Sequence, residues 1–144
     1  MRVAAVDLGR RRIGVAVSDA TSTLATPWKT VDGRGPAPEV AARLVAVLRE
    51  LVHGEDGLHR LVVGLPVHLD GQPHAEGART REIAGVLERR LRVPVTLQDE
   101  RLTSVEAEQR LAEHERDWRK RKQRLDAAAA AVMLQEYLDS RTGA

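Results

Sequence analysis

Short connections between the first three strand-like segments restrict the fold of this chain more than any other feature. Apolar residues alternate or run together at 2–6, 13–18 and 24–31, which is the pattern of β-strands. The connections between these segments are shorter than the crossover that a parallel pair of strands requires, which is roughly a dozen residues or more. The sequence therefore predicts three antiparallel strands joined by turns.

Helical and strand patterns alternate in the rest of the chain. Pro38 suits the first turn of a helix, and the apolar residues after it recur at helical spacing. The further elements that we expect are a strand at 58–64, a helix at 75–91, a strand at 93–98, and helices at 103–115 and 124–138. Strands that alternate with helices pair in parallel. We predict an α/β fold with a five-stranded mixed sheet, three antiparallel strands then two parallel ones, flanked by helices.

The composition fits a single domain with an aliphatic core. Hydrophobic residues make up 42% of the chain but include no Phe, so Val, Leu, Ile and Ala must fill the core. We expect one domain at 1–140 and a disordered tail at 141–144. The absence of Cys excludes disulfides and thiolate metal sites. The 23 basic and 21 acidic residues are too balanced to indicate a nucleic-acid partner by themselves.

The sequence also disfavours a histidine metal site and a location in or across a membrane. The five His residues show no paired spacing of the kind that metal ligands have, so we interpret each as a surface or structural residue. No stretch approaches the roughly 20 apolar residues of a membrane-spanning helix, and the apolar run at the start is too short for a signal peptide. We therefore expect a cytoplasmic protein that does not enter the membrane.

Acidic residues occur where the expected strands and the last helix end or begin. Asp7 ends the first strand, Glu100 ends the fifth, and Asp126 begins the last helix. In open α/β sheets, the loops at the carboxyl ends of strands converge on a common site. Hydrolysis of a phosphodiester by two divalent ions needs carboxylates from separate elements, and hard oxygen ligands suit Mg²⁺ or Mn²⁺. Asp7, Asp126 and either Asp99 or Glu100 could supply such a set.

Each acid also has an explanation that involves no chemistry. Asp7 could be a turn residue, the triplet 99–101 could be a solvated loop, and Asp126 could cap a helix. Carboxylates collected at one place without a cation would repel one another, which favours bound metal if the acids do converge. The sequence alone leaves both explanations open.

Four segments of the chain resemble motifs of the YqgF (RuvX) family in their order and spacing. They are VDLGRRRIGVAVSD, VVGLP with the following LDG, LQDERLTSVEA and LDAAAAAVMLQEYL, and the resemblance covers residues 2–138. It implies a ribonuclease-H-like fold and a nuclease that processes precursor 16S ribosomal RNA, at its 5′ end, or resolves branched Holliday-junction DNA. Members of the family commonly have a small or polar residue where Arg10 stands, and the segment 114–123 matches no family motif in detail.

The resemblance implies that Asp7, Glu100 and Asp126 are the catalytic residues and the metal ligands, with Mg²⁺ or Mn²⁺ as the cofactor. From the residues alone, Asp99 and Glu100 are alternatives, because strand alternation often fails at the last residue of a strand. The resemblance favours Glu100 and leaves Asp99 in a supporting role. Arg101 could bind a phosphate or pair with a neighbouring acid.

A run of basic residues, RDWRKRKQR at 116–124, precedes Asp126. We expect a loop here, either simply solvated or in contact with the phosphates that the acids alone would repel. Trp118 could stack on an unpaired base or anchor the loop. The residues that we predict to bind substrate are Arg101 and four members of the run, Arg119, Lys120, Arg121 and Lys122.

Two alternatives to a nuclease belong to other functional classes. The chain could be a non-catalytic RNA-binding factor of ribosome assembly that uses the same fold. VDLGRRRIGVAVSD also resembles the phosphate-binding hairpin of actin-like nucleotide-binding proteins, although 144 residues leave no room for their second domain. The partner that we expect is structured RNA or branched DNA. A homodimer is one arrangement that the sequence allows, but the sequence does not decide the oligomeric state. The sequence does not decide between RNA and DNA.

Overall fold

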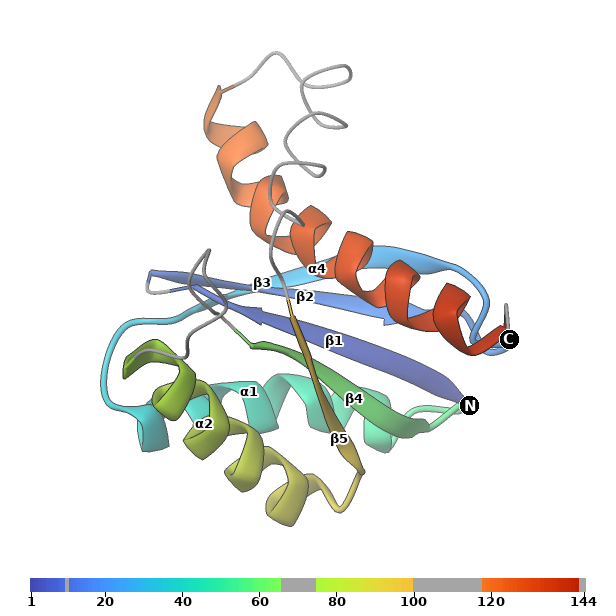
Figure 1. Cartoon of the computed structure of the whole chain (residues 1–144), viewed down its shortest axis with the longest axis horizontal. Helices are drawn as coiled ribbons and strands as arrows, with labels where there is room; N and C mark the ends of the chain where they lie inside the picture. The colour runs from blue at the N-terminus through green and yellow to red at the C-terminus, as the bar shows by residue number, and fades with distance from the viewer. Residues whose placement is uncertain (10, 66–74, 100–117, 143–144) are drawn as a thin grey trace.

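The computed structural model describes residues 1–9, 11–65, 75–99 and 118–142 of the chain. In these ranges the strands are β1 (Arg2–Leu8), β2 (Arg12–Ser18), β3 (Ala25–Asp32), β4 (Leu58–Leu65) and β5 (Val95–Asp99), and the helices are α1 (Ala37–Val52), α2 (Ala75–Leu91) and α4 (Trp118–Thr142). Figure 1 shows the sheet as a central layer, with α1 and α2 on one side and α4 on the other. Within the same ranges, none of the helices has the length and apolar character needed to cross a membrane.

The sheet has the strand order β3-β2-β1-β4-β5, which places β1 at its centre. β2 pairs antiparallel with both β1 and β3. β4 pairs parallel with both β1 and β5. The predicted mixed sheet is therefore confirmed, and the short connections did indicate the antiparallel half.

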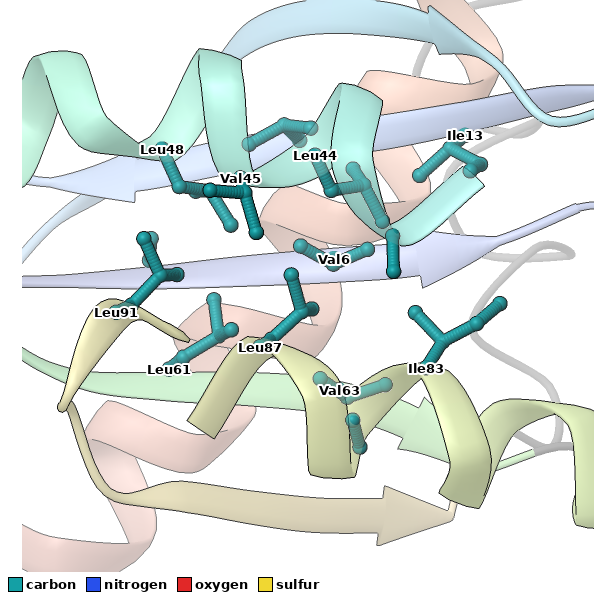
Figure 2. Packing of buried hydrophobic residues seen from close by; sticks show 14 of the residues in the cluster. Val6, Ile13, Leu44, Val45, Leu48, Leu61, Val63, Ile83, Leu87 and Leu91 are labelled. Carbon is teal, nitrogen blue, oxygen red and sulfur yellow. The ribbon is translucent and has the colours of Figure 1, made fainter. Parts of the chain in front are cut away.

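The side chains of β1 alternate between two apolar cores. Ala4 and Val6 belong to the larger core under α1 and α2, part of which Figure 2 shows. Val3 and Ala5 belong to a second core under α4. All four residues are at most 2% exposed. A strand that is covered on both faces has a continuous run of apolar residues instead of alternating apolar and polar ones, which explains the run from Val3 to Val6.

Small and aliphatic residues hold α4 against the sheet. Ala130, Met133 and Leu134 are fully buried, and Tyr137 lies in the same core as Val3 of β1. Because Ala130 has only a methyl group, the helix backbone can approach the strands closely. The apolar stripe of α4 therefore forms part of the core.

The boundaries of several elements differ from the predicted ones. The sequence predicts a loop at 116–124, but α4 begins at Trp118, so this prediction is wrong from residue 118 onward. Arg, Lys and Gln are good helix formers, and the segment has neither Gly nor Pro to stop a helix. β1 continues two residues past its predicted end, to Leu8, and α4 continues to Thr142, two residues into the expected tail. The helix predicted at 103–115 lies outside the described residues.

Candidate active site

Asp7 lies near the carboxyl end of the central strand, on the face that α4 covers. Val3 and Ala5 point to that face, and the alternation of β1 gives Asp7 the same direction. Its side chain is half-buried, and no residue in the described part of the chain forms a hydrogen bond or ion pair with the carboxylate. Asp7 pairs with Gly14 inside the sheet, so it is not a turn residue. An acid that is partly removed from water without a partner is costly, which favours a functional role.

Glycines lie beside Asp7 on both neighbouring strands. Asp7 pairs with Gly14 of β2. Val6 pairs with Val63, so Gly64 is the next residue of β4 alongside Asp7. These residues form a row across the strands of the sheet. Because glycine has no side chain, neither neighbour of Asp7 in this row places a side chain next to the carboxylate. The row continues to Gln98 of β5, which pairs with Gly64.

Two glutamines fix the direction in which α4 crosses the sheet. The amide of Gln98 donates a hydrogen bond to the carbonyl oxygen of Met133 over 3.2 Å. Farther along the helix, Gln135 accepts a hydrogen bond of 2.9 Å from the backbone N–H of Ala25, at the start of β3. Gln98 lies in the row of Asp7, whereas Ala25 pairs with Ser18, near the amino end of β1. The residues of α4 before Met133 therefore extend toward the carboxyl end of β1.

Asp126 stands on this part of α4. It is four residues before Ala130 and seven before Met133, so its position shares the helix face that packs on the sheet. Seven residues correspond to about 10 Å of helix rise. The prediction that Asp126 begins the last helix is wrong, because the helix begins at Trp118. A capping role therefore does not explain an acid at this position, since capping acts at the first turn.

The acids at the end of β5 are only partly described. β5 ends at Asp99, which pairs with Leu65, and both Glu100 and Arg101 lie outside the described residues. Val95 packs against the core under α1 and α2, so alternation assigns position 99 to that face, opposite to Asp7. The choice of Glu100 as the ligand stays a prediction.

The structure does not test whether the three predicted ligands meet, because Glu100 is one of them. Among the residues described, no group of three or more His, Asp or Glu side chains could hold a metal ion. The chemistry of the available donor nevertheless fits a hard cation, because Asp7 offers carboxylate oxygens that no other described group engages.

The predicted substrate-binding residues of α4 occupy its first two turns. Positions 119–122 are consecutive in the helix. Consecutive helical residues point about 100° apart, so these four positions surround the helix instead of forming one face. Contacts of these positions with a substrate are not tested, and Arg101 lies outside the described residues.

Shifted pKa values among the described residues belong to Asp19, between β2 and β3, to Asp32, the last residue of β3, and to Arg34 just after it. The Thr21 hydroxyl and the backbone N–H groups of Leu24 and Thr23 lower the pKa of Asp19 to about 2. The backbone N–H and the guanidinium of Arg34 lower the pKa of Asp32. Both carboxylates organise loops, and we assign neither to the candidate active site.

A cleft on the opposite face of the sheet was not predicted from the sequence. Its polar residues include Arg79 and Thr80 of α2, and its other walls come from the β1–β2 turn, the β3–α1 loop and α1. No local motif marks residues that four separate elements bring together. Only the alternation of β1, which sends Leu8 to this face, carried a signal.

Known structures and sequences similar to the chain agree with this geometry. The structure of Thermus thermophilus RuvC in complex with a Holliday junction substrate matches 99% of this chain and 96% of its own, with a TM-score of 0.59. The sequence identity is 19%, so the likeness shows the fold alone. The predicted ribonuclease-H-like fold is confirmed.

Relatives in several bacteria cover nearly the whole chain. A protein of Anaeromyxobacter dehalogenans is 44% identical over 141 residues, which are 98% of this chain and 98% of the relative. A protein of Thermosynechococcus vestitus is 41% identical over 140 residues, covering 97% of this chain and 89% of the relative. Both carry the name "Putative pre-16S rRNA nuclease". The model of the RuvX family, described as Holliday junction resolvase, matches residues 1–140, and the chain therefore belongs to the RuvX family.

Proposed function

We propose that this chain is a divalent-metal-dependent endonuclease that hydrolyses phosphodiester bonds in structured nucleic acid. The names of its relatives and its family support two substrates, precursor 16S rRNA and Holliday-junction DNA. That the precursor is cut at its 5′ end is part of the proposal. The observation that carries the proposal is Asp7, a half-buried acid at the carboxyl end of the central strand. It has no partner among the described residues, and glycines stand on both sides of it.

In this proposal, Asp7, Glu100 and Asp126 hold Mg²⁺ or Mn²⁺. Two bound ions would supply an activated water and positive charge at the leaving oxygen. The central strand fixes Asp7, and the core under α4 fixes the helix that carries Asp126. Gly14 and Gly64 keep side chains away from the carboxylate, which leaves that row of the sheet to the ligands of the reaction.

Basic residues would supply the affinity for nucleic acid. A site made only of acids repels phosphates, so a nuclease needs cations beside it. The residues that we propose for this role are Arg101, Arg119, Lys120, Arg121 and Lys122. The last four stand on the turns of α4 that precede Asp126.

Cleavage assays test the proposal directly. The full chain is incubated with structured RNA that includes a 16S precursor, with junction DNA and with plain duplexes, in Mg²⁺, Mn²⁺ or chelator. We expect cleavage that stops with chelator. Asp7→Asn should reduce the rate by about 100-fold or more, because metal ligation contributes several kcal/mol to the barrier. Glu82→Gln, which removes an exposed acid from α2, is the matched control and should change nothing.

A folded Asp7→Asn protein that cleaves at the rate of the unaltered chain would contradict the proposal. Binding of structured RNA without cleavage in any metal would instead favour the non-catalytic assembly factor. The homodimer and the cytoplasmic location stay predictions. Sedimentation equilibrium of the pure chain tests the first, and fractionation of cells that express it tests the second.

A further inference from the structure

A cleft of about 440 Å³ opens on the α1/α2 face, at the same end of the sheet as Asp7. Leu8 lines it, so the cleft begins one residue after Asp7 and on the opposite side of β1. Ile13, Val40 and Ile83 form its apolar wall, and Figure 2 shows Ile13 and Ile83 at the end of the apolar cluster nearest the tip of β1. The volume lies in the range of small-molecule sites.

Backbone contacts hold the walls of the cleft in place. A side chain at Gly33 would approach the carbonyl oxygen of Gly9 to 2.6 Å, so the β3–α1 loop packs directly on the β1–β2 turn. The N–H of Gly33 donates to the carbonyl oxygen of Arg11 over 2.9 Å. Arg79 of α2 donates from Nη1 to the carbonyl oxygen of Gly35 over 2.9 Å and from Nη2 to that of Gly33 over 3.0 Å. The cleft is therefore formed before any ligand arrives.

Arg79 places a positive charge in the cleft wall beside neutral partners. The two acceptors of its guanidinium among the described residues are backbone carbonyls, and Arg79 is half-buried. The other Arg residue in the cleft wall, Arg34, forms an ion pair with Asp32, with 3.1 Å between Nε of Arg34 and Oδ1 of Asp32. Among the residues described, no carboxylate pairs with Arg79. A cation that is partly removed from water favours an anion beside it.

Thr80 contributes a hydroxyl to the same cleft. Thr80 is 2% exposed, and within the described ranges its hydroxyl takes part in no hydrogen bond. Among the described residues, only Nε of Arg2 is a fully enclosed side-chain atom without a partner, so the Thr80 hydroxyl is open to the cleft that it lines. Thr80 follows Arg79 in α2, so the unpaired hydroxyl and the cation belong to one cleft.

We propose that this cleft binds a single nucleotide, with its phosphate at Arg79 and Thr80 and its base on the apolar wall. The cation and the hydroxyl match the charge and the acceptor oxygens of a phosphate. Inorganic phosphate would leave Leu8, the apolar lining residue that is only partly buried, without a contact, whereas a base covers it. The same chemistry recognises a free mononucleotide and one nucleotide of a bound strand.

Isothermal titration of the full chain tests the proposal, with 5′-mononucleotides, the matching nucleosides and inorganic phosphate as ligands. We expect a mononucleotide to bind more tightly than either part alone. Thr80→Val keeps the shape of the side chain and removes the unpaired hydroxyl, so it should weaken the binding of nucleotide by about 3- to 10-fold. It should not lower the melting temperature, because the hydroxyl holds nothing in the fold. Arg81→Gln, at an exposed position of α2, is the control and should not alter binding.

Arg79→Gln removes the charge and should weaken binding more than Thr80→Val does. It also loosens the β3–α1 loop, so Thr80→Val decides the question. Failure of every mononucleotide to bind, or equal affinity in the Thr80→Val protein and the unaltered chain, would overturn the proposal.

Competition separates the two sources of the ligand. A 5′-phosphorylated oligonucleotide that displaces a labelled mononucleotide, and that binds Thr80→Val less well, identifies the cleft as a site for one nucleotide of the strand. An oligonucleotide that does not displace the label identifies a free nucleotide as the ligand. Asp7→Asn should retain binding in the cleft. The inference does not depend on nuclease activity, so its failure and that of the proposed function are distinguishable.

Discussion

Ala130 offers the sharpest test of whether α4 positions a catalytic acid. Its side chain is 0% exposed in the core with Val3 and Ala5 of β1, and it stands four residues after Asp126 on the same helix face. Ala130→Val adds two methyl groups where the packing leaves no space. Overpacking of this kind costs about 1–3 kcal/mol and moves backbones apart. For a chain of this length, that corresponds to a melting temperature lower by about 3–9 °C.

The effect on cleavage should exceed the effect on stability. Carboxylates that hold metal must lie within about 0.5 Å of their productive positions, and a displacement of 1 Å is worth up to about 100-fold in rate. We expect kcat of Ala130→Val to fall by about 10- to 100-fold at temperatures where the protein is fully folded. Circular dichroism melts and single-turnover cleavage of the same preparations measure both quantities.

Ala131→Val is the matched control. It makes the same change one residue later, where the side chain is only partly buried, and it carries the same loss of helix propensity. Its stability and its rate should both remain closer to those of the unaltered chain. An Ala130→Val protein that loses stability as expected but cleaves at the full rate would refute the reasoning. Cleavage would then not depend on where α4 holds Asp126.

Three further outcomes are expected. Glu100→Gln should reduce cleavage more than Asp99→Asn, and the reverse order of the rates would identify Asp99 as the ligand. Neutralising residues 119–122 together should weaken binding to many sequences alike. If all four residues contact phosphates, the slope of log affinity against log salt becomes shallower by about 3.6. Because the four positions surround the helix, we expect roughly half of that change. An unchanged slope would exclude contact of these residues with phosphates. Asp19→Asn should lower stability at pH 7 but not near pH 2. The pKa of Asp19 is lowered to about 2 in the folded state, so the carboxylate stabilises the fold above its ordinary pKa near 4, and this stabilisation is lost as the pH falls through about 2. Equal shifts of the melting temperature at both pH values would contradict this.

Most of the fold could be predicted because local patterns and sheet topology agree. The short connections before residue 32 allowed only antiparallel pairing, and the helical spacing after Pro38 predicted α1. The wrong loop at 118–124 has a different origin. A dense run of charge is typical of solvated loops, but Arg, Lys and Gln also favour helix, and no Gly or Pro broke the extension of α4.

The candidate site could be predicted only in part, since its acids are far apart in the sequence. Alternation along β1 and β5 decides which acids share a face, and it could be read from Val3, Ala5 and Gln98. The position of Asp126 on the sheet-facing side of α4 depended on knowing where the helix begins. Arg79 and Thr80 carried no signal at all, because an unpaired group is recognised only once its surroundings are known.

The central strand links the two sites that the structure offers. Asp7 and Leu8 are consecutive, and because strand residues alternate, Asp7 lies on the face that α4 covers and Leu8 faces the cleft. Both sites lie at the carboxyl end of β1, with the sheet between them. A strand of nucleic acid that crossed this end could reach the carboxylate on one face and place a neighbouring nucleotide in the cleft on the other. The geometry would then fix where the chain is cut relative to the nucleotide that is held, which is how a nuclease without base-specific contacts at its metal site can still select a position.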